Sequence, residues 1–184
     1  MERKQVAQKL KYQIDLQDVF DRAYSNKGKE IRSALRPMLS DNNFKIEFGK
    51  EAIREIVKRT QDQGIDKKGT RFVKYAEAYK KSIQFKIAGK TSKVNLTLTG
   101  EMLASMVPKA LTKKINVEFA DGQQNDKAHG HVTGGGHLPV RDFFGLPEKV
   151  EEEVMRKVLN KMAREETLSK VEITAEIGRQ KIAF

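Results

Sequence analysis

The stretch KVNLTLTGEMLASMVPKALTKKINVEF, residues 93–119, decides the fold of this chain. Apolar residues alternate with polar ones over 94–98 and again over 115–119, the period-two pattern of strands with one buried face. Between them, Thr99 and Gly100 interrupt the first strand, and Glu101 stands where the dipole of a new helix favours negative charge. The stretch therefore predicts strand, short helix and strand as the nucleus of a small sheet.

A helical hairpin is predicted ahead of this unit. Apolar residues recur at helical spacing over 2–24 and over 29–38, and Pro37 is expected to kink or end the second helix near Leu35. The narrow apolar seam of the hairpin fits either packing on the domain's own core or contact with a neighbouring subunit.

The segment between the hairpin and the quoted stretch carries a weaker signal. Phe44, Ile46 and Phe48 alternate with polar residues and suggest a short strand. A helix is expected over 50–61, with Gly64 as its C-terminal stop.

The C-terminal third holds the clearest helix of the chain. Pro147 suits its first turn, acidic residues follow within 148–153, and an apolar stripe continues to Met162, so a helix is expected to about residue 166. The remaining tail suggests a strand at 171–177, either an edge strand or an arm for a neighbouring subunit.

These elements define an α+β fold with a small antiparallel sheet, an N-terminal helical hairpin, a short helix between strands and a long C-terminal helix. We divide the chain into an N-terminal helical arm (1–45), a core (46–166) and a C-terminal extension (167–184).

Composition limits what the protein can do. The 184 residues are 38% hydrophobic and 33% charged, contain no cysteine and carry a net charge of +11. Disulfides and thiolate metal sites are therefore excluded, and no apolar run reaches the roughly 20 residues of a membrane helix. Residues 1–128 hold 27 Lys and Arg against 16 Asp and Glu, whereas 129–184 hold nine of each. This uneven distribution of charge suits binding to nucleic acid, to an acidic partner or to an acidic face of another copy of the chain. Alternatively, the basic side chains form an ordinary solvated surface.

The positive charge concentrates in residues 64–93, which carry nine Lys or Arg against two acids, with four aromatic residues between them. Cations that displace counterions and rings that stack on bases would suit nucleic acid. Alternatively, the aromatic spacing is that of the buried stripe of a short helix whose lysines face solvent. The candidate contacts with a DNA channel or an acidic partner are Lys67, Lys68, Arg71, Lys74, Lys80 and Lys81.

Residues 121–136 are polar and rich in glycine, and we expect a loop that is mobile or that a partner orders. His129, His131 and His137 lie in or beside it, but three consecutive glycines argue against rigid metal ligation. No cofactor is predicted. Ser105 lacks the context of a catalytic nucleophile and the sequence has no phosphate-loop motif, so we expect no enzyme.

Several motifs in this order resemble a known family. GTRF at 69–72 precedes LTLTGEMLASM at 96–106, an Ala-x-x-His-x-x-Gly-like loop at 128–134 and LPVRDFFGL at 138–146. The order is similar to that of the virion-morphogenesis, tail-completion or head–tail joining proteins of tailed bacteriophages. Their pattern is Leu-x-x-Thr-Gly-x-Leu-x-x-Ser, a His-x-x-Gly loop and Pro-x-Arg-x-Phe-x-Gly-Leu. The likeness covers about residues 50–165.

The resemblance implies a structural protein without catalytic activity, located in the virion neck and in the host cytoplasm during assembly. It implies a ring, expected as a hexamer, between tail tube and head connector. Its partners would be itself, other neck, connector and tail proteins, and genomic DNA in the channel, with no membrane. The expected docking loop comprises His129, His131, Gly134, Gly135, Gly136, Arg141, Phe143 and Phe144.

Two other functions stay open on sequence grounds. A basic nucleic-acid-binding protein acting alone would bind DNA with a steep dependence on salt. A metal-dependent hydrolase would use His129, His131 and His137.

Overall fold

A computed structural model describes residues 8–97, 99–135 and 138–180, with side chains as far as residue 165. It confirms the α+β fold, with a three-stranded antiparallel sheet of order β1-β3-β2. The strands are β1 (Lys11–Asp15), β2 (Met106–Ala110) and β3 (Lys114–Phe119). The helices are α1 (Leu16–Ala23), α2 (Lys29–Leu35), α3 (Asn42–Lys58), α4 (Glu77–Lys80), α5 (Ile83–Ile87), α6 (Glu101–Ala104), α7 (Gly122–Thr133) and α8 (Glu148–Gln180).

The central strand β3 carries the apolar face of the sheet. Val117 lies opposite Tyr12 on β1 and Pro108 on β2, and it is fully buried. Because side chains alternate along a strand, Ile115 and Phe119 share its face, and both are buried. Among the described strands, β2 pairs with β3 alone, and this edge position tolerates Pro108 because no second neighbouring strand there needs its missing N–H.

The helix α3 packs on the sheet and begins earlier than predicted. Asp41 caps it by accepting a hydrogen bond from the backbone N–H of Phe44 at 2.8 Å. Phe44 and Phe48, one turn apart, are fully buried, whereas Ile46 is only partly so. The predicted strand at these residues is wrong, since three alternating residues also fit a helix face. A π turn, Arg59–Gln63, extends the helix to Gly64, whose φ of 64° confirms the predicted stop.

The N-terminal hairpin is confirmed only in part. The predicted helix over 2–24 is wrong at residues 8–15, of which 11–15 form β1, and its first part, 2–7, lies outside the described residues. Asp15 ends the strand and caps α1, because its carboxylate accepts hydrogen bonds from the backbone N–H groups of Gln17 and Asp18. The second helix, α2, ends at Leu35, just before Pro37, as predicted.

Within residues 93–119, α6 and β3 are confirmed, whereas the strand predicted at 94–98 is wrong over 94–97, and Leu98 lies outside the described residues. In the described part of the chain, no strand pairs with residues 94–97, although Val94 and Leu96 are buried. The φ of Leu96 is 50°, which lies outside the β region. The hairpin partner of β3 is β2, which begins directly after Ser105 ends α6.

Two segments predicted as a loop and a strand are helical. Residues 122–133 form α7, because Asp121 caps its start through the backbone N–H groups of Gln123 and Gln124, and Gly134 closes it with a φ of 77°. The helix α8 starts where predicted but continues to Gln180, so the strand at 171–177 is wrong.

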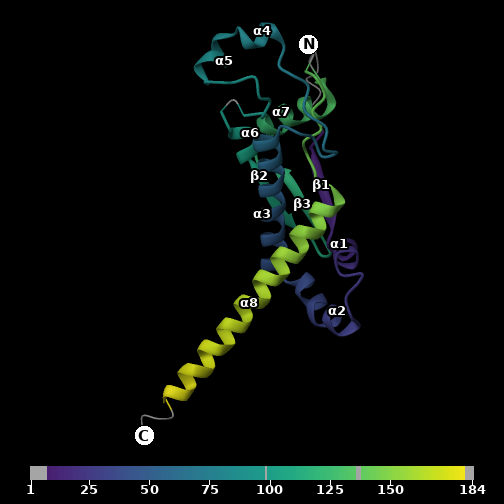
Figure 1. Cartoon of the computed structure of the whole chain (residues 1–184), viewed down its shortest axis with the longest axis vertical. Coiled ribbons are helices and arrows are strands. Elements are labelled where there is room, and N and C mark those ends of the chain that lie inside the picture. The colour runs from purple at the N-terminus through teal and green to yellow at the C-terminus, as the bar shows by residue number, and fades with distance from the viewer. Residues whose placement is uncertain (1–7, 98, 136–137, 181–184) are drawn as a thin grey trace.

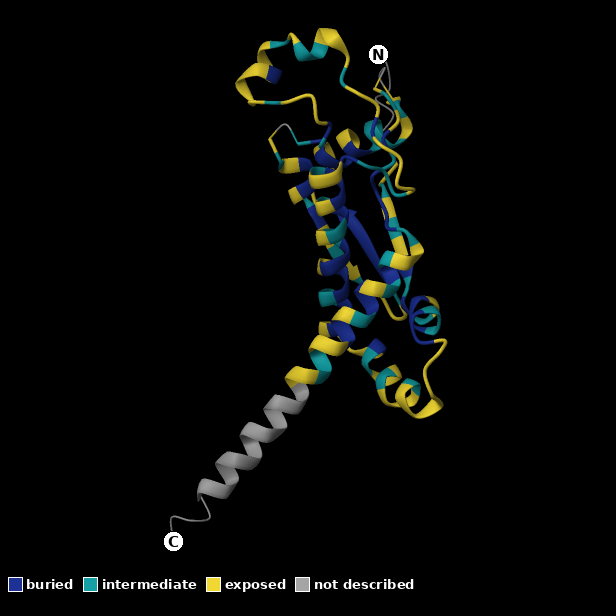
Figure 2. Cartoon of the chain, in the orientation of Figure 1, coloured by how far each residue is buried: buried dark blue, intermediate teal, exposed yellow. Residues whose placement is uncertain are grey.

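The core lies where the sheet, α3 and the first half of α8 meet (Figure 2). Val154, Met155, Val158 and Leu159 of α8 are buried there. Beyond this region α8 extends away from the body, while α4 and α5 stand at the opposite end of the molecule on a largely exposed excursion of the chain (Figures 1 and 2).

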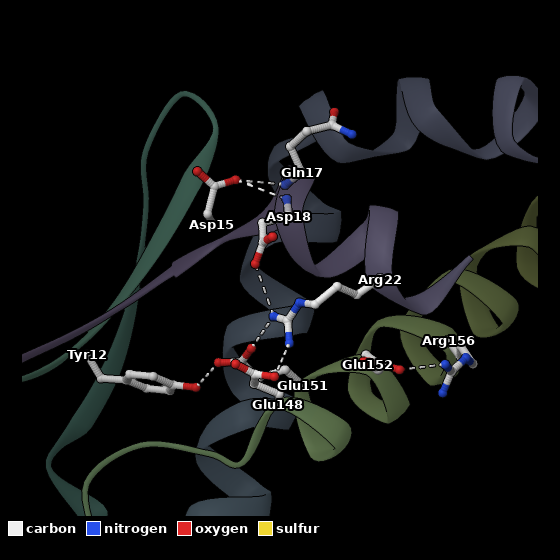
Figure 3. A network of polar contacts seen from close by, with 9 residues as sticks. All are labelled: Tyr12, Asp15, Gln17, Asp18, Arg22, Glu148, Glu151, Glu152 and Arg156. Atoms are coloured by element: carbon white, nitrogen blue, oxygen red, sulfur yellow. Dashed lines mark hydrogen bonds and ion pairs between the residues drawn. The ribbon is translucent and has the colours of Figure 1, made fainter. Parts of the chain in front are cut away.

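A buried carboxylate attaches α8 to β1 and α1 (Figure 3). Glu151, 9% exposed, accepts hydrogen bonds from the Tyr12 hydroxyl and, at 2.7 Å, from Nη2 of Arg22. Burial and the Glu151 carboxylate raise the pKa of Tyr12 far above its ordinary value, so the phenol remains a donor at any physiological pH.

Gly49→Ala is expected to destabilise the protein, although alanine favours helices. A Cβ at position 49 would lie 2.4 Å from Cβ of Pro108 and 2.6 Å from Cδ1 of Ile115. Against a rigid proline we expect the upper part of the overpacking range, a net loss of about 1–2 kcal/mol after the helix-propensity gain. Urea unfolding measures it. Gly28→Ala is the control, because nothing lies within 4 Å of its added Cβ; equal midpoints would contradict the close helix–sheet contact.

Glu151→Ala is expected to lower the free energy of unfolding by about 2–3 kcal/mol, because the buried Tyr12 hydroxyl loses its acceptor. Tyr12→Phe should cost only about 1 kcal/mol, since Arg22 still neutralises the carboxylate. Glu152→Ala, a control that removes a partly exposed pair one residue along α8, should cost at most about 0.5 kcal/mol. Denaturant unfolding at pH 7 ranks the three variants, and any other order would contradict the stabilising role of the Glu151 contacts with Tyr12 and Arg22.

Candidate functional site

A cavity of about 750 Å³ opens among four segments of the chain. Its walls come from residues 73–76 and from Tyr79 of the following α4, from residues within 90–102 before and in α6, from α7, and from residues within 138–141. The motifs at 96–106 and 138–146 therefore contribute to one site, and α7 completes it.

The charged side chains of the cavity wall all have one sign. The wall contains Lys74, Lys90, Lys127 and Arg141, and no Asp or Glu is among the described residues that form it. Lys90 donates a hydrogen bond to Oδ1 of Asn95 at 2.6 Å, and burial lowers its pKa. Cations gathered in a concave, partly apolar site raise the local potential, so the cavity attracts anionic groups.

Arg141 is the most buried of these cations, with 3% of its surface exposed. Its Nη2 donates to the carbonyl oxygen of Val73 at 3.0 Å, and its guanidinium lies 5.6 Å from the ring centroid of Tyr75. Its backbone N–H donates to the carbonyl oxygen of His131 at 2.7 Å. Burial lowers the pKa of Arg141, but arginine stays charged in proteins. Its Nε has no hydrogen-bond partner within the described structure.

Two polar atoms of α7 also lack a hydrogen-bond partner within the described structure. Oε1 of Gln124 and Nδ1 of His131 are buried in the cavity wall without a partner among the residues the structure describes. Burial, together with the charge of Arg141, lowers the pKa of His131 to about 4, so its ring is neutral at pH 7. Buried polar atoms are normally hydrogen-bonded, so Arg141, Gln124 and His131 each keep an unused donor or acceptor beside the cavity that they line.

An aromatic cluster supports the wall at 73–79. The ring centroids of Tyr75, Tyr79 and Phe85 lie 5.3–5.5 Å apart. They come from an extended segment, α4 and α5, so the single short helix expected to carry Phe72, Tyr75 and Tyr79 is wrong. The rings nevertheless pack in a cluster, and Phe72 and Phe85 are buried. The aromatic side chains thus pack against one another. This agrees with the interpretation that they are buried packing residues, although not in a single helix.

Hydrogen bonds from Arg59, at the end of α3, fix the position of the segment 138–147. Arg59, 8% exposed, donates Nη2 hydrogen bonds to the carbonyl oxygens of Phe143 at 2.6 Å and Gly145 at 2.8 Å. Because the two acceptors are fixed to a buried guanidinium, the preceding residues have little freedom. Arg141 is thereby presented to the cavity by a backbone that the core anchors.

The six basic candidates fall into three groups. Lys74 lines the cavity. Lys67 and Lys80 form ion pairs, at 2.9 Å with Asp142 and at 2.6 Å with Glu77. Three candidates are exposed and form no ion pair within the described residues, namely Lys68, Arg71 and Lys81.

The expected docking loop is not a loop over most of its length. His129 and His131 belong to α7, Gly134 ends that helix and Gly135 follows it. Gly136 and His137 lie outside the described residues. Phe143 and Phe144 are core side chains, 0% and 6% exposed, so a partner at this site would meet Arg141 and its neighbours instead. No group of three His, Asp or Glu side chains in the described structure is placed to hold a metal ion.

Sequence reasoning did not single out Gln124 and Lys127 and counted Lys90 only as part of a basic run. The first two were missed because α7 was predicted as a loop. A capping signal was available, since Asp121 and Gln124 stand at the N-cap and third positions of a helix and Gly134 fits a C-terminal stop. The high glycine content of the segment outweighed it.

Comparisons with family models, with curated proteins and with solved structures find no match to this chain. Among its described residues, none of the helices has the length and apolar character needed to cross a membrane. Function must therefore be inferred from the motifs and from the geometry of the cavity, which offers positive charge, hydrogen-bond donors and apolar surface in one place.

His131→Gln is expected to flatten the pH dependence of stability. The pKa of His131 is about 4 in the folded protein against 6.5 ordinarily, so between these values the unfolded chain binds the extra proton and stability falls as the pH falls. From pH 7 to pH 5 the wild type should lose about 1 kcal/mol more than the variant, after allowance for partial exposure. Urea unfolding at both pH values measures this difference.

The control is His129→Gln, which removes the neighbouring histidine of α7 and keeps His131. It should retain the wild-type difference between the two pH values. An equal loss of stability from pH 7 to pH 5 in the wild type and in His131→Gln would show that burial does not lower the pKa of His131.

Proposed function

We propose that this chain is a structural protein of the neck of a tailed-phage virion, which completes the tail and joins it to the head connector as a ring of identical subunits. One observation carries the proposal: the motifs at 96–106 and 138–146, which β3 and α7 separate along the chain, form walls of one cavity. Motifs that act together in a family are expected to meet in space.

The shape of the chain supports assembly with neighbours. The first half of α8 packs in the core, and the helix then extends beyond the body (Figure 1). A head-to-tail ring needs each subunit to reach the next, and a projecting helix supplies such reach. The long excursion that carries α4 and α5 at the other end gives a second extension (Figure 1).

The charge distribution supports an acidic target. The surplus of positive charge lies in residues 1–128, and Lys68, Arg71 and Lys81 are exposed without an ion pair in the described structure. In a ring these cations would face genome phosphates in the channel or carboxylates of a neighbouring protein. The same cations favour the second candidate, a basic protein that binds nucleic acid on its own.

The experiment that tests the neck role uses phage particles. Particles assembled without the protein are expected as filled heads and separate tails in negative-stain images. Joined, infectious particles formed in its absence would contradict the proposal. Tight DNA binding by a monomer, weakening steeply with salt, would favour the second candidate instead.

The variant Lys68→Glu, Arg71→Glu, Lys81→Glu is expected to reduce the fraction of joined, DNA-filled particles about tenfold or more, because each substitution replaces attraction to an acidic target by repulsion. Counting particles by electron microscopy measures it. Lys27→Glu, Lys29→Glu, Lys113→Glu is the control: it makes the same change of net charge at exposed positions elsewhere. Equal losses in both variants would show that only net charge matters.

A further inference from the structure

We propose that the cavity binds a short segment of another protein in which a carboxylate side chain stands beside a large apolar one. This inference goes beyond the neck role and does not depend on it, because it rests on the walls of the cavity alone.

The first argument is the set of unpartnered polar atoms. Arg141 and Gln124 are more than nine-tenths buried, yet Nε of the first and Oε1 of the second have no partner in the described structure. Nε is a donor and Oε1 an acceptor. Both side chains line the cavity, so a rotation that turns these atoms toward it would let a ligand with an acceptor and a donor pair with them, as a carboxylate and the backbone N–H of a peptide do.

The second argument is charge. Lys74, Lys90 and Lys127 join Arg141 in the wall, and no acidic residue among those described there offsets them. A carboxylate that enters the cavity gains these attractions and fits the Arg141 donor. A basic or neutral segment would leave four cations close together without a counter-charge.

The third argument is the apolar margin of the cavity. Val73 and Leu138 line it and are 56% and 40% exposed, and Val140, between the lining residues Pro139 and Arg141, is 58% exposed. A small anion would leave these aliphatic side chains in water. A chain segment that runs across the mouth would cover them, and exposed apolar groups beside a cavity mark such contacts.

A nucleic acid fits this cavity less well. The aromatic residues of the wall, Tyr75 and Tyr79, pack against each other and against Phe85, and Arg141 lies over the Tyr75 ring. Bases are held by free aromatic faces, and these rings are engaged. The aliphatic margin matches apolar side chains of a protein.

The test begins with selection of binding peptides from a displayed library of short random sequences, with the full chain as target. Enriched peptides should carry Asp or Glu next to Leu, Ile, Met, Phe or Trp. No enrichment, or enrichment of peptides without acidic residues, would overturn the proposal.

A synthetic copy of one enriched peptide is then titrated by fluorescence anisotropy. Lys74→Glu, Lys127→Glu changes two exposed cations of the wall and should weaken binding about tenfold or more, since attraction to the peptide carboxylate is replaced by repulsion. Lys27→Glu, Lys29→Glu makes the same charge change at exposed positions outside the cavity and should keep the affinity within about twofold. Equal weakening by both pairs would overturn the site, given unchanged circular dichroism.

Two further measurements separate the remaining explanations. Bound peptide should shift the ring signals of His131 in NMR spectra, assigned with His131→Gln, and unshifted His131 signals would place binding elsewhere. A single-stranded oligonucleotide should displace the peptide only weakly. Displacement at lower concentration than the unlabelled peptide itself would identify a nucleic-acid site and refute the proposal.

Discussion

The close approach of α3 to the sheet at Gly49 is the constraint on which the rest of the structure depends. Any side chain there would overlap Pro108 and Ile115, so the helix lies nearer to the strands than another residue would permit. At the C-terminal end of the same helix, the buried Arg59 donates hydrogen bonds to two carbonyl oxygens of the segment 138–147. The helix that packs closely on the sheet therefore also fixes part of this segment.

This anchoring explains how a cavity can keep a buried cation. Removing a guanidinium from water is costly, and at Arg141 one carbonyl hydrogen bond and one aromatic face offset only part of that cost. The lowered pKa values of His131 and Lys90 arise chiefly from burial, and at His131 the charge of Arg141 adds to it. The hydrogen bonds from Arg59 fix the backbone that follows Arg141, and this helps to keep the guanidinium of Arg141 buried although it would be better hydrated in water.

Proline and charge at the ends of helices predicted where α2 ends and where α8 begins, and both are confirmed. Three alternating residues predicted β3 correctly, but the same pattern at 44–48 was wrong, because so short a pattern fits either a helix or a strand. The five residues of β1 were likewise predicted as part of a helix. At 94–97 the residues are buried as predicted, but Leu96 takes a positive φ that no periodicity reveals.

The sequence predicted which motifs contribute to the candidate site, but not which of their residues line the cavity and which are buried in the core. Arg141 and Lys74 were named from sequence and line the cavity, whereas Phe143 was expected at a docking surface and lies in the core. The reason is physical: a motif mixes residues that contact a ligand with residues that position them, and only burial separates the two. Residues 93–119 show the same division, since β3 forms the centre of the sheet while the turn at Thr99 and Gly100 lines the cavity. The stretch that forms the centre of the core therefore also forms part of the cavity wall. A substitution in β3 that destabilises the core is thus expected to change the shape of the cavity as well.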